Sequence, residues 1–129
     1  MSIEELIRRH GLEPHPFEGW WRETAHLKGQ SREGLQLIGA ADEAHWHRID
    51  AQTTYRLEEK GPAVISLSRD GQTAAGHRLV APGSTLTVEA GVLRALSCLG
   101  AAALLRITLK PDCRVTDRDL MPDDWFPKP

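Results

Sequence analysis

The sequence predicts an all-β fold, a sandwich or barrel preceded by one short helix. Two observations lead to this prediction. Short β-like runs follow one another from residue 34 onward with turn residues between them, and several runs alternate apolar with polar residues. The 129 residues are enough for one domain with a core of its own.

The first element is predicted to be a helix that begins after Ser2 and ends at Gly11. Ser2 and Glu5 have the spacing of a capping box, and Gly11 suits the left-handed residue that ends many helices. From Leu12 to Glu33, prolines and glycines interrupt the chain, so we expect an irregular N-terminal arm there.

The predicted strands occupy the rest of the chain up to residue 110. Their ranges are Leu35 to Ile38, Ala44 to Ile49, Thr53 to Glu58, Ala63 to Ser68, Gly76 to Val80, Thr85 to Ala90, Val92 to Cys98 and Ala102 to Leu109. Asp70-Gly71 and Pro82-Gly83 are turn signals, and we expect each to join antiparallel neighbours. We therefore divide the single domain into a helix and arm (1–33), a barrel (34–110) and a polar tail (111–129).

Composition excludes several classes of protein. The 16 Lys and Arg nearly balance the 18 Asp and Glu, which leaves no basic surface for nucleic acid. No apolar run is long enough to span a membrane, and the first 11 positions carry Glu4, Glu5, Arg8 and Arg9 where a signal peptide would be apolar. We expect a soluble, cytoplasmic protein with no nucleic-acid or membrane partner, in which Cys98 and Cys113 are reduced thiols.

His45-Trp46-His47 is the first candidate for chemistry. Side chains two apart in a strand point to the same side, so both imidazoles are expected to face one way, where they could share a metal ion or a polar ligand. The alternative is one interior histidine bonded to a neighbour, with the other at a strand end.

Arg94 and Tyr55 are the next candidates. Arg94 has the parity of Leu96 and Cys98, which places its guanidinium on the apolar face and predicts an anionic partner; a slipped strand would instead turn it outward. Tyr55 has the parity of Thr53, so its hydroxyl is expected inside, as a donor or weak acid, or in simple core packing.

These residues, in this order, resemble the cupin superfamily. Its first motif is a Gly, five residues and His-x-His, then a Glu; here Gly39 precedes His45 by five residues, and Gln52 or Thr53 occupies the Glu region. The second motif resembles the stretch from Gly83 to Arg94, in which Arg94 replaces the ligand His.

A closer resemblance is to the branch known as cupin 5, or domain of unknown function 985. Residues 11–24, GLEPHPFEGWWRET, match its opening segment, and Trp46-His47-Arg48-Ile49-Asp50 and Thr108 to Asp112 match later landmarks. The resemblance implies a cupin-type double-stranded β-helix, or jelly-roll barrel, frequently a homodimer, with a ligand pocket in the barrel mouth. It brings no known reaction.

Three functions remain open on this basis. We favour a small-molecule binding protein whose pocket holds an anionic metabolite or sugar, because an inward arginine beside histidines suits an anion. The alternative is a metal-free epimerase or isomerase in which His47 is the base and Tyr55 the acid. The second alternative is a metal-dependent cupin enzyme, for which His45 and His47 would be the ligands and His77 the other histidine among the strands.

The candidate binding residues are accordingly His45, Gln52, Thr53, Arg94 and Arg22, the last of which either lines the pocket or pairs with an acid on the surface. We expect no cofactor, because the guanidinium of Arg94 opposes a cation.

Overall fold

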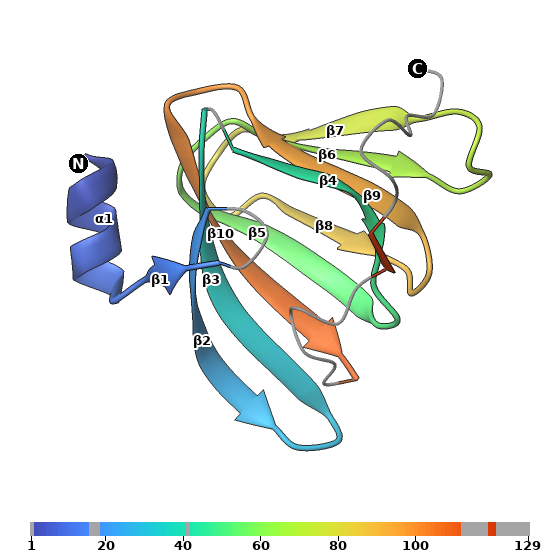
Figure 1. The fold of residues 1–129 in the computed structure, drawn as a ribbon, viewed down its shortest axis with the longest axis horizontal. Coiled ribbons are helices and arrows are strands. Elements are labelled where there is room, and N and C mark those ends of the chain that lie inside the picture. The colour runs from blue at the N-terminus through green and yellow to red at the C-terminus, as the bar shows by residue number, and fades with distance from the viewer. Residues whose placement is uncertain (1, 16–18, 41, 112–118, 121–129) are drawn as a thin grey trace.

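The fold consists of two antiparallel sheets and one helix (Figure 1). The computed structural model describes residues 2–15, 19–40, 42–111 and 119–120. The six-stranded sheet has the order β1 (Glu13–Pro14), β2 (Trp20–Leu27), β3 (Ser31–Gly39), β10 (Ala102–Lys110), β5 (Gln52–Lys60) and β8 (Thr85–Val88). The five-stranded sheet has the order β11 (Asp119–Leu120), β4 (Glu43–Arg48), β9 (Leu93–Cys98), β6 (Ala63–Ser68) and β7 (Ala75–Leu79).

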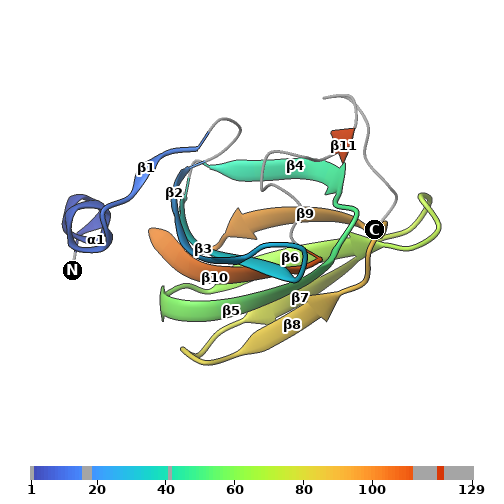
Figure 2. The same cartoon turned by 90° about the horizontal axis from the view of Figure 1, so that it is seen from below.

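The two sheets curve toward each other around a common interior, as the view from below shows (Figure 2). Alternate residues of the strands fill this interior. In β5, for example, Thr53, Tyr55 and Leu57 are buried while Gln52 and Arg56 are exposed. The inward direction predicted for Tyr55 and Thr53 is therefore confirmed, and Tyr55 and Leu57 belong to the apolar core between the sheets.

Helix α1 (Ile3–His10) covers the outer surface of the six-stranded sheet. The Ser2 hydroxyl accepts the backbone N–H of Glu5 at 3.1 Å, and Gly11 ends the helix with a φ of +63°, as predicted. Leu6 is fully buried against Leu37 and Leu104. Because α1 packs on the outside, the barrel interior is left to the strands.

The expectation of an irregular arm from Leu12 to Glu33 is wrong. Strand β2 lies there and pairs with β3 from Trp20↔Leu37 to Leu27↔Ser31. The glycines that suggested an arm stand outside the strand, since Gly19 precedes it and Gly29 lies in the turn to β3 with a φ of +76°. Figure 1 shows the β2–β3 hairpin as the long lower edge of the molecule.

Of the two predicted turns, one joins antiparallel neighbours and one does not. Asp70-Gly71 lies between β6 and β7, which pair from Ala63↔Leu79 to Leu67↔Ala75. Pro82-Gly83 instead carries the chain from β7 in one sheet to β8 in the other, where β8 pairs with β5. The backbone N–H of Gly83 donates to the Leu57 carbonyl at 2.7 Å, so this turn is held by β5.

The two cysteines and the predicted tail are only partly covered by the described residues. Cys98 is a free, buried thiol that donates to the Gly100 carbonyl, and its burial raises its pKa. Cys113 and nearly all of the predicted tail lie outside the described residues. In the described part of the chain, no helix has the length and apolar character needed to cross a membrane.

Candidate functional site

A cavity in the barrel interior brings together polar side chains from the N-terminal segment and from three strands. Its volume is about 440 Å³, counted with its open mouth. The lining residues are His15, Trp21, Gly34, Leu35, Gln36, His47, Ile49, Tyr55, Leu96, Ile107 and Leu109. Most of these residues are apolar. Besides Trp21, four have polar side-chain groups: His15, Gln36, His47 and Tyr55. These four decide what the cavity can bind.

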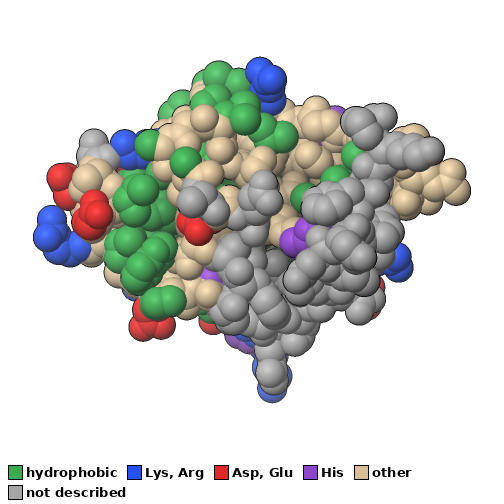
Figure 3. Space-filling view, turned by 45° about the horizontal axis from the view of Figure 1, so that its top comes forward, with side chains coloured by type: hydrophobic (Ala, Val, Ile, Leu, Met, Phe, Trp, Pro, Cys, Tyr) green, Lys and Arg blue, Asp and Glu red, His purple; other side chains and the backbone are tan. Residues whose placement is uncertain are grey.

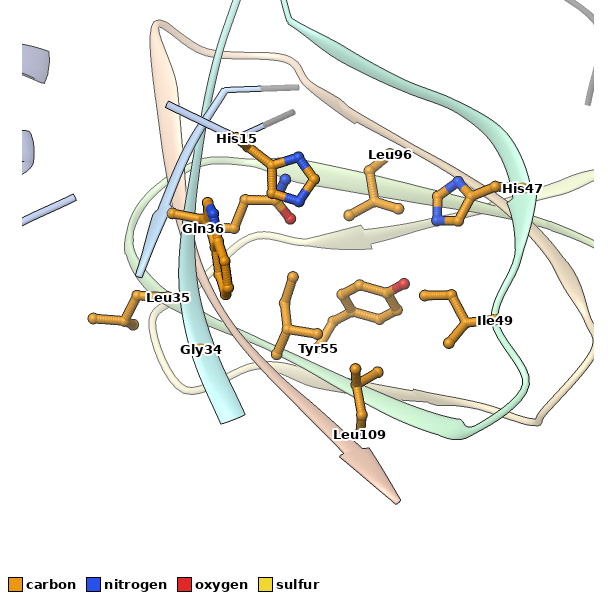
Figure 4. A pocket seen from close by; sticks show the side chains of 11 residues that line it. His15, Gly34, Leu35, Gln36, His47, Ile49, Tyr55, Leu96 and Leu109 are labelled. Atoms are coloured by element: carbon orange, nitrogen blue, oxygen red, sulfur yellow. The ribbon is translucent and has the colours of Figure 1, made fainter. Parts of the chain in front are cut away.

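The close-up of this cavity shows two polar groupings (Figure 4). His15 and Gln36 lie together on one side, whereas the His47 ring and the Tyr55 hydroxyl lie on the other.

On the exterior, by contrast, many of the charged side chains in view gather at the end that carries α1 (Figure 3).

His47 is a buried member of this wall. It is 1% exposed, and its Nδ1–H donates to the backbone carbonyl of its neighbour His45 at 2.6 Å. Because a carbonyl oxygen only accepts, this bond assigns the hydrogen to Nδ1 and leaves Nε2 as the atom that accepts a proton in the neutral ring.

His45 does not share the cavity with His47, contrary to the expectation that both imidazoles face one side. It lines a separate hollow with Trp46, Ser66 and Ser97. The reason is a β-bulge in β4. Ala44 pairs with Leu96 and His47 pairs with Arg94, so three steps along β4 match two along β9. The extra residue changes the side to which the following side chains point.

Arg94 points inward, as its parity predicted, but it lies behind the cavity wall. Its side chain is fully buried. Nε donates to the Val92 carbonyl at 3.2 Å, Nη2 to the Glu89 carbonyl at 3.0 Å and Nη1 to the Tyr55 hydroxyl at 3.5 Å. Among the described residues no carboxylate pairs with it, so the predicted anionic partner is absent there and its contacts are uncharged acceptors.

Tyr55 is the residue through which Arg94 reaches the cavity. It is 2% exposed and lines the wall. Gln52 and Thr53, which stand in the region where the cupin motif has a Glu, differ in burial. Thr53 is buried and its hydroxyl donates to the Ala51 carbonyl at 3.2 Å, whereas Gln52 is exposed. Neither Thr53 nor Gln52 lines the cavity.

Arg22 has a structural position on the surface. Its Nη1 donates to the carbonyl of His10, the last residue of α1, at 3.2 Å, and its side chain is exposed. Alternation along β2 puts its neighbour Trp21 in the cavity wall instead. Arg22 is thus not among the residues that line the barrel cavity; it lines a separate hollow with Gly11 and Glu13.

Sequence reasoning missed His15 and Gln36 as cavity residues. Signals for both were present: His15 lies in the 11–24 segment that carries the family resemblance, and Gln36 interrupts an apolar run in β3. The His15 backbone N–H donates to the Gly19 carbonyl at 2.9 Å, and its ring stands edge-on to Trp21, with centroids 5.8 Å apart.

The donor set does not fit a cupin metal centre. The two imidazoles that line the cavity, His47 and His15, lie on opposite sides of it, and His45 lies in the separate hollow. Arg94, which the resemblance aligns with a further ligand histidine, carries a guanidinium that cannot bind a cation. Within the part of the chain that the structure describes, no group of three or more His, Cys, Asp or Glu side chains is placed to hold a metal ion.

Comparison with solved structures finds proteins with a similar fold. A hypothetical protein from Leishmania major superposes with a TM-score of 0.81 at 18% identity, covering 94% of this chain and 88% of that one. A protein from Shewanella oneidensis gives 0.80 at 16% identity, covering 94% and 85%. KdgF from Halomonas sp., a cupin-fold protein, gives 0.66 at 13% identity, covering 81% and 90%.

A scan of protein-family models gave no match, and neither did a search of curated proteins. At these identities the likenesses concern the fold alone. Together with the two antiparallel sheets and the short N-terminal helix, they show that the chain folds as a cupin-type double-stranded β-helix.

Proposed function

We propose that this protein binds a small organic anion, of the carboxylate class, in the barrel cavity. The observation that carries the proposal is the bond from Arg94 to Tyr55, in which a fully buried cation contacts a side chain that lines the cavity. A small-molecule-binding cupin was also the function favoured by the residues alone.

The electrostatic argument begins with the cost of a buried charge. A guanidinium removed from water loses its hydration, and carbonyl and hydroxyl oxygens compensate only partly. A negative charge in the neighbouring cavity would complete the compensation, because Coulomb attraction is strong where the dielectric constant is low.

The hydrogen-bond directions support the same ligand. The Tyr55 oxygen accepts an N–H from Arg94, so its own O–H is a donor that can point toward the cavity. The His47 ring lies on the same side of the cavity as this hydroxyl (Figure 4). A hydroxyl donor that contacts a buried cation, in a mostly apolar cavity, suits a carboxylate on an apolar body.

A thermal-shift experiment on metal-stripped protein tests the proposal. Acetate, butanoate, citrate and a sugar acid are compared with zinc, nickel and iron salts. A ligand that binds only the folded state raises the melting temperature. We expect a carboxylate to stabilise the native protein and Tyr55→Phe to abolish the shift, whereas Arg78→Met, on exposed β7, retains it.

Stabilisation by a divalent metal that His47→Gln abolishes would contradict the proposal and favour a metal enzyme. A carboxylate shift that persists unchanged in Tyr55→Phe would equally contradict it, because the anion would then lie elsewhere.

A second candidate function is a metal-free isomerase, which the fixed His47 tautomer favours. Nε2 would take a proton from the carbon next to a carbonyl, leaving an enolate, and the Tyr55 O–H would return a proton to that carbon. Delivery to the face opposite the one that lost its proton inverts the carbon. Arg94 would stabilise the phenolate until solvent reprotonates it, while the His47 imidazolium returns its proton to solvent. Exchange of that C–H with deuterium in D₂O, lost in His47→Gln, would support this reaction; binding without exchange would exclude it for that ligand.

The narrower assignments follow as proposals. We propose that the chain belongs to the cupin 5 branch, since His15 and Trp21 of the matching 11–24 segment both line the cavity. We also propose a homodimer, which light scattering on the purified protein would test by giving twice the mass of the 14.3 kDa chain.

A further inference from the structure

We infer that the ligand is bifunctional: a short acid that carries a hydroxyl or carbonyl group at the end opposite its carboxylate. In this assignment, which rests on the proposed function, the carboxylate lies at the Tyr55 hydroxyl and the second group lies at Gln36 and His15. The supporting feature is the separation of the polar cavity residues into two groupings with apolar walls between them.

Gln36 is the stronger part of this second grouping. It lies on β3, where its interior neighbours are Gly34 and the core residue Ile38, and it is only 5% exposed. A primary amide both donates and accepts, so it can pair with a hydroxyl or a carbonyl oxygen. Gln36 stands in a mostly apolar wall, where the few polar groups decide how a ligand is oriented.

His15 reaches the same place from outside the barrel strands. The bond of its backbone N–H to Gly19 and the edge-on contact with Trp21 hold the residue, which is 9% exposed. Gly19 in turn lies so close to β3 that an added Cβ would stand 2.1 Å from the Leu37 carbonyl oxygen. The N-terminal segment therefore seats His15 beside Gln36.

The strand order sets the distance between the two groupings. Tyr55 pairs with Ile107, which pairs with Gly34, so β10 lies between the strands that carry Tyr55 and Gln36. Two strand spacings amount to roughly 10 Å between backbones. The side chains extend inward from both strands, so the space between their polar ends suits a short chain with its two polar groups a few bonds apart.

Calorimetric titration with matched acids tests the inference. Pentanoate is compared with 5-hydroxypentanoate and 4-oxopentanoate, and the series is repeated with the butanoate and hexanoate equivalents. In the native protein we expect at least one functionalised acid to bind about tenfold more tightly than the plain acid of the same length, the effect of one added hydrogen bond.

Two variants separate the ends of the cavity. Gln36→Met keeps the side-chain length and removes the amide, so it should reduce that tenfold preference to about one while leaving the plain acid within about twofold. His15→Phe is the second variant for the same end. Tyr55→Phe should weaken the plain and functionalised acids by the same factor.

The outcomes distinguish the two proposals. Equal affinities for plain and functionalised acids at every length, or a preference that survives both Gln36→Met and His15→Phe, would overturn the bifunctional ligand while leaving the anion site intact. If no acid of either kind binds the native protein, the proposed function itself is overturned, and this inference with it. Circular dichroism of each variant confirms that it is folded.

Discussion

Arg94 and Tyr55 connect the two sheets through the interior of the barrel. Arg94 lies on β9 of the five-stranded sheet and Tyr55 on β5 of the six-stranded sheet, and Nη1 of the arginine donates to the tyrosine hydroxyl at 3.5 Å. Both side chains are almost fully buried. The same bond thus contributes to stability and directs a positive charge toward the cavity.

Tyr55→Phe is expected to lower the free energy of unfolding by about 1 to 2 kcal/mol, because it leaves a buried N–H of Arg94 without an acceptor while keeping the ring packed. Chemical denaturation measures this. Thr54→Val is the matched control on the same strand, since its hydroxyl bond to Thr87 is exposed. Equal losses of unfolding free energy in the two variants would show that the buried bond contributes no more to stability than the exposed one.

Gly19→Ala is expected to destabilise the protein by about 3 kcal/mol or more, because the new methyl combines left-handed strain with a clash against β3. Gly29→Ala is the control: its φ is also positive, at +76°, but nothing lies within 4 Å of its Cβ position. It should cost only about 1 to 2 kcal/mol. Thermal or urea unfolding measures both, and a similar loss in each would contradict the close approach of Gly19 to Leu37.

Arg106→Met is expected to lower the free energy of unfolding by about 1 kcal/mol, a value typical of a networked ion pair at the surface. Its Nε donates to Glu58 at 2.8 Å and its Nη1 to Glu33 at 3.1 Å, and the bond and charge of Glu58, followed by those of Glu33, raise its pKa.

Arg56→Met serves as the control for Arg106→Met in urea denaturation. Arg56 also faces Glu58, at 3.7 Å, but its side chain is 53% exposed against 32% for Arg106. We expect a change within about 0.5 kcal/mol. A larger loss for Arg56→Met than for Arg106→Met would be inconsistent with the bond geometry.

Asp70 is expected to titrate below its ordinary value of 3.8, because the backbone N–H groups of Thr73 and then Gln72 donate to its carboxylate and lower its pKa. A carboxyl whose pKa is lower in the folded state stabilises that state above the unfolded value and stops doing so as pH falls through the folded value. An NMR titration of the Asp70 carboxyl carbon measures the midpoint directly.

Stability measurements at acidic pH give a second test of Asp70. As pH falls from about 5, the native protein should lose stability more steeply than Asp70→Asn, whose side chain does not titrate. Identical slopes of unfolding free energy against pH in the two proteins, together with an NMR midpoint at or above 3.8, would contradict the stabilising role of the Asp70 carboxylate.

Much of the fold was predictable because it follows from local patterns. The helix signals at Ser2 and Gly11 act over one or two turns, and alternation in β5 directly reports which face is buried. The inward direction of Arg94 and Tyr55 was predicted in this way. Strand β2 was missed because β1 pairs with only its first two residues and most of the others are exposed, so no apolar alternation marks it.

The sequence by itself determined the fold class and the inward direction of Arg94 and Tyr55. Only the tertiary structure decided which polar groups share a cavity. A bulge in β4, set by its pairing with β9, separated His45 from His47, and the β1–β2 segment brought in His15 from far along the chain. The physical reason is that periodicity acts between neighbouring residues, whereas register and bulges depend on hydrogen bonds between strands distant in sequence.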